Sequence, residues 1–220
     1  MSGGAVMSLV TIDELTDVQL DVLREIGNIG QGNAATSLSS FSGGCVNIAV
    51  PDVSVLGVSE VMEFMGGPDE VVAGIMVRMT GAVCGMMLTI LRRDFVTKMV
   101  DTVFGHRVED FGELNDIERS FVEEIGNILS GSYLNAICEL SGLSADVSVP
   151  DVTVDMVGAI LSVPAIESAV NGSKVLFIDG GFKFSDKYEH YAGQKASCHM
   201  IFIPELSSLN RIFSVLGVEK

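Results

Sequence analysis

Apolar residues recur every three or four positions in two long segments of the chain, 17–40 and 116–140. This spacing puts them on one side of an α-helix, so each segment is predicted to be a long helix with one buried face. Both segments carry the same start and stop signals, a capping box and a serine–glycine pair. These are Thr16 with Gln19 and Ser42-Gly43 in the first segment, and Asn115 with Glu118 and Ser141-Gly142 in the second.

Shorter apolar segments, rich in β-branched residues and bounded by Gly, Pro or Asp, follow each long helix and predict strands. Two further periodic segments predict the helices that close the two halves of the chain. The predicted strands are 46–55, 75–79, 83–90, 145–154, 174–178 and 197–203, and the closing helices are 93–103 and 207–215.

Residues 71–91 form the longest apolar run, in a chain that is 48% hydrophobic. A membrane-spanning helix here would have to bury Arg78 in hydrocarbon, at a high cost in free energy. Two strands joined by a tight turn at Thr80-Gly81 explain the run better. The N-terminus lacks the basic region of a signal peptide, so we expect a cytoplasmic protein with no membrane contact.

The chain repeats itself. Shifting the sequence by 99 positions aligns 25–55 with 124–154, and 13 of the 31 aligned residues are identical. A duplication of this kind predicts two copies of one structural unit. We expect an α+β fold with pseudo-two-fold symmetry, in which helices pack on a central, mainly antiparallel sheet. After an N-terminal tail, 1–15, residues 16–220 would form a single domain whose repeats span about 16–105 and 115–220.

The formal net charge is −16, and no cluster of Lys and Arg interrupts it. An acidic surface repels phosphates, so binding to nucleic acid is disfavoured. The cysteine and histidine residues are too widely spaced for a zinc site, and we expect the thiols to be free and buried. They are Cys45, Cys84, Cys138 and Cys198, with His106, His190 and His199.

The sequence GNIGQG, residues 27–32, has three glycines and could at first be taken for a phosphate-binding loop. Such a loop needs its glycines directly after a strand, at the N-terminus of a helix. Here the glycines lie inside a capped helical pattern, and the second copy reads GNILSG. A phosphate loop is therefore disfavoured, and the polar residues beside the glycines become the candidates.

Glu25 and Asn28 are three residues apart, and so are Glu124 and Asn127, which places each pair on one helix face. Asp21 or Ser120 extends this face by a turn on one side, and Gly32 or Gly131 extends it on the other. Glycine inside a helix costs about 1 kcal/mol relative to alanine. Either the glycines at 27/126 and 32/131 let the helix pack closely inside the protein, or they let a partner approach the Glu/Asn face.

An acid and an amide are a sparse set of groups for catalysis. Asn does not titrate, so it cannot act as a general base, but its carboxamide can orient a water molecule. Orientation alone can lower a barrier by several kcal/mol. Such a site suits a substrate that is already reactive and brings its own metal ion, such as an aspartyl phosphate on another protein. The Glu could then form an ion pair with a lysine beside that phosphate.

The pattern Asp21-x3-Glu25-x2-Asn28 is followed after 22 residues by Pro51, and Ser120-x3-Glu124-x2-Asn127 is followed at the same distance by Pro150. This doubled pattern resembles the two motifs of the CheC family of chemotaxis phosphatases, to which CheX and FliY are related. The resemblance implies hydrolysis of the aspartyl phosphate of a CheY-type response regulator. Asn28 and Asn127 would orient the attacking water, and Glu25 and Glu124 would contact the regulator's lysine. The protein would need no cofactor of its own, because the regulator carries Mg²⁺.

The resemblance also implies partners. CheX proteins act as dimers, whereas a duplicated chain carries both sites itself, so we expect a monomer. CheC-like proteins bind the receptor deamidase CheD, and a predicted short helix at 155–161 is a candidate contact, through Asp155, Gly158 and Ala159. An ordinary packed helix is the alternative for this segment. The alternative for the whole protein is a non-catalytic regulator that binds CheD, phosphorylated CheY or both.

Overall fold

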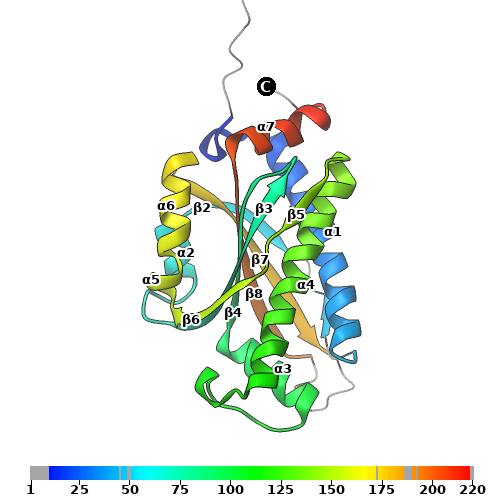
Figure 1. Cartoon of the computed structure of the whole chain (residues 1–220), viewed down its shortest axis with the longest axis vertical. Coiled ribbons are helices and arrows are strands. Elements are labelled where there is room, and N and C mark those ends of the chain that lie inside the picture. The colour runs from blue at the N-terminus through cyan, green and yellow to red at the C-terminus, as the bar shows by residue number, and fades with distance from the viewer. Residues whose placement is uncertain are drawn as a thin grey trace, which may run out of the picture.

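A computed structural model describes residues 10–44, 46–48, 51–171, 173–185, 190–191 and 193–218. Within them the two repeats have the same order of elements, except that the second has two helices, α5 and α6, where the first has α2 (Figure 1). The first consists of α1 (Asp17–Phe41), β1 (Val46–Ile48), β2 (Asp52–Gly57), α2 (Val58–Phe64), β3 (Val71–Gly81), β4 (Gly85–Arg92) and α3 (Arg93–Phe104). The second consists of α4 (Asp116–Ser141), β5 (Ala145–Val147), β6 (Asp151–Met156), α5 (Val157–Ile160), α6 (Ser162–Asn171), β7 (Lys174–Phe184), β8 (Lys195–Pro204) and α7 (Leu206–Val215). Short 3₁₀ turns at Ile12–Glu14 and Phe111–Glu113 precede α1 and α4.

The ends of the two long helices agree with the sequence prediction to within one residue. Both capping boxes form, and in α4 the Asn115 side chain accepts hydrogen bonds from the backbone N–H groups of Ile117 and Glu118. The buried Glu118 carboxylate caps the Asn115 N–H in return, and its other oxygen lies 2.7 Å from His106 Nε2. α4 ends at Gly142, which has the positive φ of 67° typical of a helix C-terminus.

The described strands form one eight-stranded antiparallel sheet with the order β1-β7-β8-β4-β3-β5, in which β2 also pairs with β7 and β6 with β3. The repeats therefore exchange strands: β1 and β2 lie on β7 of the second repeat, and β5 and β6 lie on β3 of the first. β4 and β8 pair at the centre of the sheet. The expected α+β fold with two repeats around an antiparallel sheet is confirmed.

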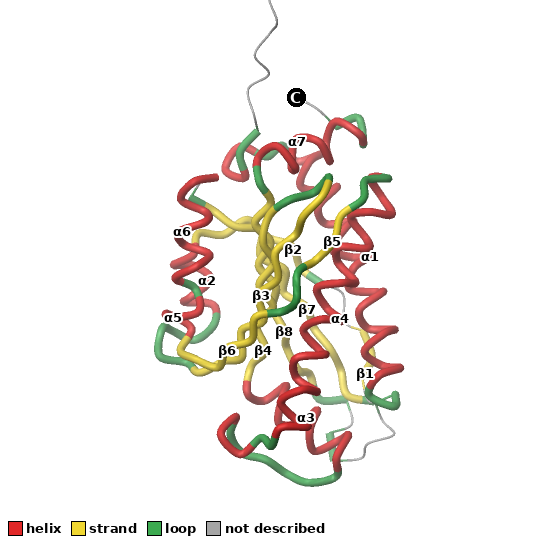
Figure 2. The backbone as a smooth tube through the Cα atoms, viewed as in Figure 1, coloured by secondary structure: helices red, strands yellow, loops and turns green. Residues whose placement is uncertain are grey.

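Helices cover both faces of the sheet (Figure 2). α1 and α4 lie side by side on one face, while α2, α5 and α6 lie on the other (Figure 1). A large apolar core fills the space under α1 and α4, and a smaller one, which includes Val61, Val157 and Phe177, lies under the helices of the opposite face. α1 and α4 are thus supported from below along their length.

The predicted single strands 46–55 and 145–154 are wrong, because each is interrupted. In the second repeat, Val147 pairs with Met79 and Asp151 pairs with Met76. The chain thus advances by four residues from β5 to β6, while the paired strand β3 advances by only three. One extra residue in a ladder is a β-bulge. The registers of β1 and β2 on β7 show the same count. Proline lacks an N–H and suits such an interruption, which explains Pro51 and Pro150.

The apolar run at 71–91 is the hairpin of β3 and β4, as predicted, although β3 is longer than the predicted 75–79. β3 continues to Gly81, which has a φ of 104°, so the turn lies at 82–84 and not at the predicted Thr80-Gly81. Arg78 is exposed, and its guanidinium lies 3.0 Å from the Glu167 carboxylate. None of the helices in the described ranges has the length and apolarity that a membrane span requires.

The cysteine prediction is only partly right. Cys84, Cys138 and Cys198 are free thiols, but only Cys198 is buried. Cys84 lies in the turn after β3 and Cys138 near the end of α4, so both are half-exposed. Cys45 lies outside the described residues.

Candidate functional site

The first candidate pair lies on α1. Glu25 and Asn28 are exposed on the side of the helix that faces away from the sheet, whereas Ile26 and Gly27 between them are buried. One turn before Glu25, the Asp21 carboxylate accepts a hydrogen bond of 2.9 Å from the Arg24 guanidinium. The acid and the amide of the first motif are thus open to solvent.

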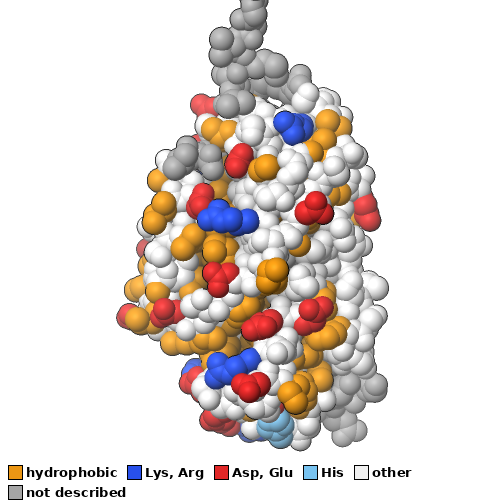
Figure 3. All heavy atoms as spheres, in the orientation of Figure 1, with side chains coloured by type: hydrophobic (Ala, Val, Ile, Leu, Met, Phe, Trp, Pro, Cys, Tyr) orange, Lys and Arg blue, Asp and Glu red, His pale blue; other side chains and the backbone are white. Residues whose placement is uncertain are grey.

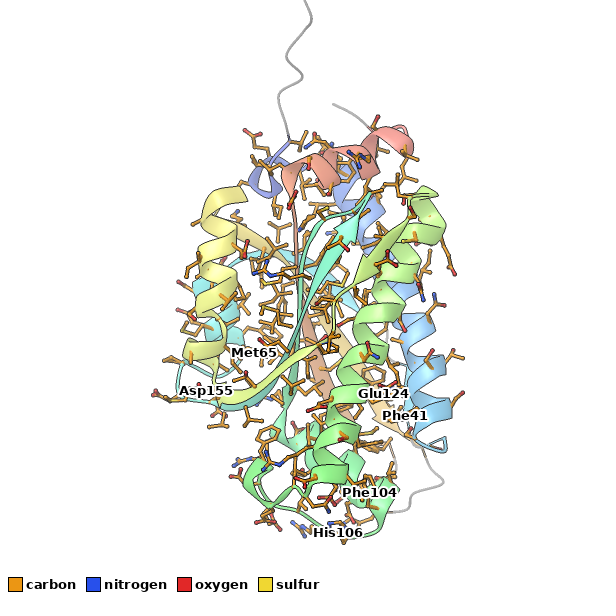
Figure 4. The ribbon with its side chains drawn as sticks, viewed as in Figure 1. Phe41, Met65, Phe104, His106, Glu124 and Asp155 are labelled. Atoms are coloured by element: carbon orange, nitrogen blue, oxygen red, sulfur yellow. The ribbon has the colours of Figure 1, made fainter. Side chains whose placement is uncertain are left out.

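The second pair lies at the matching place on α4. Glu124 is exposed (Figure 4) and Asn127 is half-buried. The Asn127 amide donates a long hydrogen bond of 3.4 Å to Glu124 Oε2. Glu123 stands where the first motif has Arg24, and Ser120 where it has Asp21. The two sites therefore share their central groups but differ in the charge around them.

α1 and α4 run antiparallel, so both pairs lie in one helical layer. Phe41 at the end of α1 stacks on Phe121 near the start of α4, with ring centroids 5.1 Å apart. Gln31 and Tyr133 meet in the middle through a hydrogen bond of 2.8 Å. With 1.5 Å of rise per residue, these two contacts separate the two motif asparagines by about 10–14 Å along the helix axes. The structure does not merge the pairs into one site.

Close packing against the sheet explains one glycine of each motif. A Cβ at Gly27 would lie 2.6 Å from Val53 Cγ2 on β2, and a Cβ at Gly126 would lie 2.6 Å from Ile75 Cγ2 on β3. Non-bonded carbon atoms do not approach each other this closely. Internal packing, one of the two explanations left open by the sequence, is therefore the reason for glycine at these two positions. Each lies directly before the motif asparagine.

A buried polar network under the helices is separate from the candidate sites. The Tyr133 hydroxyl donates to Gln31 Oε1, and the Gln31 amide donates to the Gly181 carbonyl of β7. Burial raises the pKa of the Tyr133 hydroxyl well above its usual value. Tyr133 and Gln31 are buried and so cannot contact a substrate. Their hydrogen bonds instead hold α1 and α4 on the sheet.

The chemistry of each pair consists of a carboxylate and a carboxamide. Within the part of the chain that the structure describes, no group of three or more His, Cys, Asp and Glu side chains is placed to hold a metal ion. The glycines of GNIGQG lie in the middle of α1, which rules out the phosphate loop. The face in Figure 3 carries scattered Asp and Glu and no basic cluster. These groups can bind and orient a substrate, but the reactive bond must come from elsewhere.

The segment predicted to contact CheD lies on the other side of the sheet (Figures 1 and 4). The prediction of a helix over 155–161 is wrong at its start, because Asp155 belongs to β6, which pairs with β3 up to Met156. Asp155 and Ala159 are exposed, and Gly158 packs against Pro68. A pocket of about 160 Å³ opens here; its lining includes Asp151, Asp155, Ala159, Ile160 and Val163.

Sequence analysis missed two exposed apolar residues on the site faces. Val18 on α1 is 60% exposed, and Ile117 on α4 is 71% exposed. Each lies seven residues before its motif glutamate, so each is on the same helix face, and the two are aligned by the 99-residue repeat. This spacing was the signal that could have identified them.

Comparisons with known proteins point in one direction. The model of the CheC-like family matches residues 18–55 and 117–154. The chain is 32% identical over 206 residues to the CheY-P phosphatase CheC of Bacillus subtilis (strain 168), an alignment that covers 92% of this chain and 96% of that protein. It is 29% identical over 142 residues to the flagellar motor switch phosphatase FliY of the same organism, covering 64% of this chain and 37% of FliY.

Solved structures show the same fold. The crystal structure of Thermotoga maritima FliY matches with a TM-score of 0.70 and 22% identity, over 93% of this chain and 99% of that one. The FliM middle domain from H. pylori matches with a TM-score of 0.62 and 14% identity, over 91% of this chain and 99% of that one.

Proposed function

Because the chain belongs to the CheC-like family, we propose that it hydrolyses the aspartyl phosphate of a CheY-type response regulator in chemotaxis signalling. One observation carries this proposal beyond homology. Both motif pairs face solvent, on helices that are fixed from below, and neither pair is turned into the core. A globular partner can therefore reach each Glu and Asn.

In this proposal Asn28 and Asn127 orient the water that attacks the phosphorus in line. Glu25 and Glu124 form an ion pair with a lysine of the regulator and so fix its position. The regulator also brings the Mg²⁺ that phosphoryl transfer needs. This division of roles fits the groups available, because an amide can hold water but cannot take its proton. Placing the water accurately is then the main contribution of this chain to the rate.

The two sites are expected to differ in strength. In the second, the Asn127 amide donates a 3.4 Å hydrogen bond to the Glu124 carboxylate, so Glu124 is already partly engaged before a lysine arrives, while Asn28 has no such bond to Glu25 among the described contacts. The second site also has Glu123 in place of Arg24, so it is the more acidic of the two. Binding of a regulator at each site should therefore respond differently to salt.

Asparagine variants test the assignment. Asn28→Ala and Asn127→Ala should each remove part of the rate at which phosphate is released from phosphorylated regulator, and the double variant should remove nearly all of it. The chain is used at substoichiometric concentration, so that only turnover accelerates release. Asn135→Ala is the matched control, because Asn135 is exposed on α4 but outside the motif. A double variant that works at the wild-type rate overturns the assignment.

Binding of CheD is a second proposed role, favoured by the pocket beside Asp155. Its apolar floor and the carboxylates of Asp151 and Asp155 suit an apolar segment with a basic residue. Asp155→Lys should then lose CheD in a pull-down while keeping phosphatase activity, because α1 and α4 lie across the sheet. Unchanged capture of CheD by this variant contradicts the contact. We also propose that the chain works as a monomer in the cytoplasm.

A further inference from the structure

The exposed face of each site helix has a regular spacing that continues beyond the Glu and Asn. The five positions follow one another at intervals of three, four, three and four residues. Alternation of three and four keeps side chains in one line along a helix, as in a seam between packed helices. The positions are Val18, Asp21, Glu25, Asn28 and Gly32 on α1, and Ile117, Ser120, Glu124, Asn127 and Gly131 on α4.

Each line ends at a glycine that nothing inside the described protein requires. A Cβ built at Gly32 or at Gly131 meets no other group within 4 Å. Neither glycine is among the residues with positive φ, so the backbone does not demand glycine either. Gly27 and Gly126, by contrast, would collide with the sheet. Alanine would fit at 32 and 131 and would favour the helix.

We propose that Gly32 and Gly131 are contact positions for the phosphorylated response regulator, which approaches the bare helix backbone there. This inference rests on the proposed function and extends the same site. Each glycine lies four residues, or one helical turn, beyond the motif asparagine, so its surface is continuous with the position of the attacking water. A side chain at this point would stand between the helix and a partner that reaches the asparagine.

The opposite end of the line has the complementary property. Val18 and Ile117 are exposed apolar residues two turns before the glutamate, and burying them against a partner is favourable. From this residue to the glycine the line is about 21 Å long. The contact thus has an apolar end, a central acid and amide, and an end where the backbone itself is approached.

Alanine variants separate this contact from folding. Gly32→Ala is made in a Glu124→Lys background and Gly131→Ala in a Glu25→Lys background. The reversed charge repels the regulator's lysine at the other motif, so that binding at one motif is observed at a time. Without a new clash, alanine should raise Tm by about 2–4 °C. If a partner contacts the backbone, the added methyl group overpacks the interface, and affinity should fall by roughly 5- to 150-fold. Gly32→Leu and Gly131→Leu should lose binding further.

Binding is measured by calorimetry with the CheY-type regulator of the same organism, in which beryllofluoride and Mg²⁺ on the active-site aspartate mimic the phosphoryl group. Ser37→Ala is the matched control, because Ser37 is exposed on α1 about 140° around the helix from Gly32. It should leave the dissociation constant unchanged.

The outcomes distinguish the two proposals. Wild-type dissociation constants in both the alanine and the leucine variants overturn the glycine contact and leave the phosphatase proposal standing. Binding of the regulator by the wild-type chain without faster phosphate release overturns the phosphatase proposal, and the dissociation constants of the variants still decide the glycine contact. If the wild-type chain does not bind the regulator, both proposals fail.

Discussion

Replacing Gly27 by alanine should lift α1 off the sheet, and shortening Val53 should reverse this effect. The new Cβ would lie 2.6 Å from Val53 Cγ2. Carbon atoms pack at about 3.5–4.0 Å, so helix or strand must move by about 1 Å. Overpacking of this kind costs about 1–3 kcal/mol. The gain in helix propensity offsets about 1 kcal/mol of that cost.

The net loss in free energy of unfolding should therefore reach up to about 2 kcal/mol, which lowers Tm by about 4–8 °C in a chain of this size. Val53→Ala alone removes two buried methyl groups and should cost about 1.6 kcal/mol plus a cavity term. In the double variant the methyl group at position 27 enters the space that Cγ2 left. The double variant should then be about 1–2 kcal/mol more stable than the two single changes predict together.

Urea unfolding of the four proteins, followed by circular dichroism, gives this coupling energy. Gly32→Ala serves as the control, because nothing lies within 4 Å of its Cβ and it should stabilise α1 by about 1 kcal/mol. Additive effects of Gly27→Ala and Val53→Ala, to within about 0.5 kcal/mol, would show that this contact does not position the helix. Phosphatase activity should fall with Gly27→Ala, since Asn28 moves with the helix.

Three further predictions concern the scaffold. Asn115→Ala removes the cap of α4 and should cost about 1 kcal/mol, seen as a Tm lower by about 2–4 °C, whereas Asn135→Ala should not lower Tm. Burial and a 2.6 Å hydrogen bond to Asp101 raise the pKa of Tyr191 from its usual value near 10 to about 12. The unfolded chain then releases this proton first, so stability should fall from pH 10 to 12 in urea titrations, and Tyr191→Phe should flatten the fall. Burial also raises the pKa of the Cys198 thiol, so mass spectrometry should find Cys198 unmodified by maleimide until the protein unfolds, while Cys84 reacts in the native state.

The helices and the repeat could be predicted from the sequence because their signals are local. Capping boxes at Thr16 and Asn115 fix where the helices begin, and a 3.6-residue period fixes which side is buried. The partners of the strands could not be predicted, because an apolar alternation shows that a segment is a strand and not which strand it joins. The exchange of β2 and β6 between the repeats is therefore visible only in the structure.

The candidate site shows the same division. The Glu and Asn could be placed on one helix face from their spacing alone. The roles of the glycines could not be separated, since Gly27 and Gly32 look equivalent in the sequence and differ only in what lies next to them. A glycine that meets Val53 and a glycine that meets nothing call for different explanations. Only neighbours from distant parts of the chain distinguish them.

The exchange of strands also determines how the two sites depend on each other. α4 belongs to the second repeat, yet Gly126 rests on Ile75 of β3, a strand of the first repeat that pairs with β6 of the second. β2, under Gly27, pairs in turn with β7 of the second repeat. Each site helix is thus supported by a sheet to which both repeats contribute. A change at Asn28 or Asn127 should stay local, because these side chains face solvent, whereas a change in the sheet beneath Gly126 should disturb both sites together.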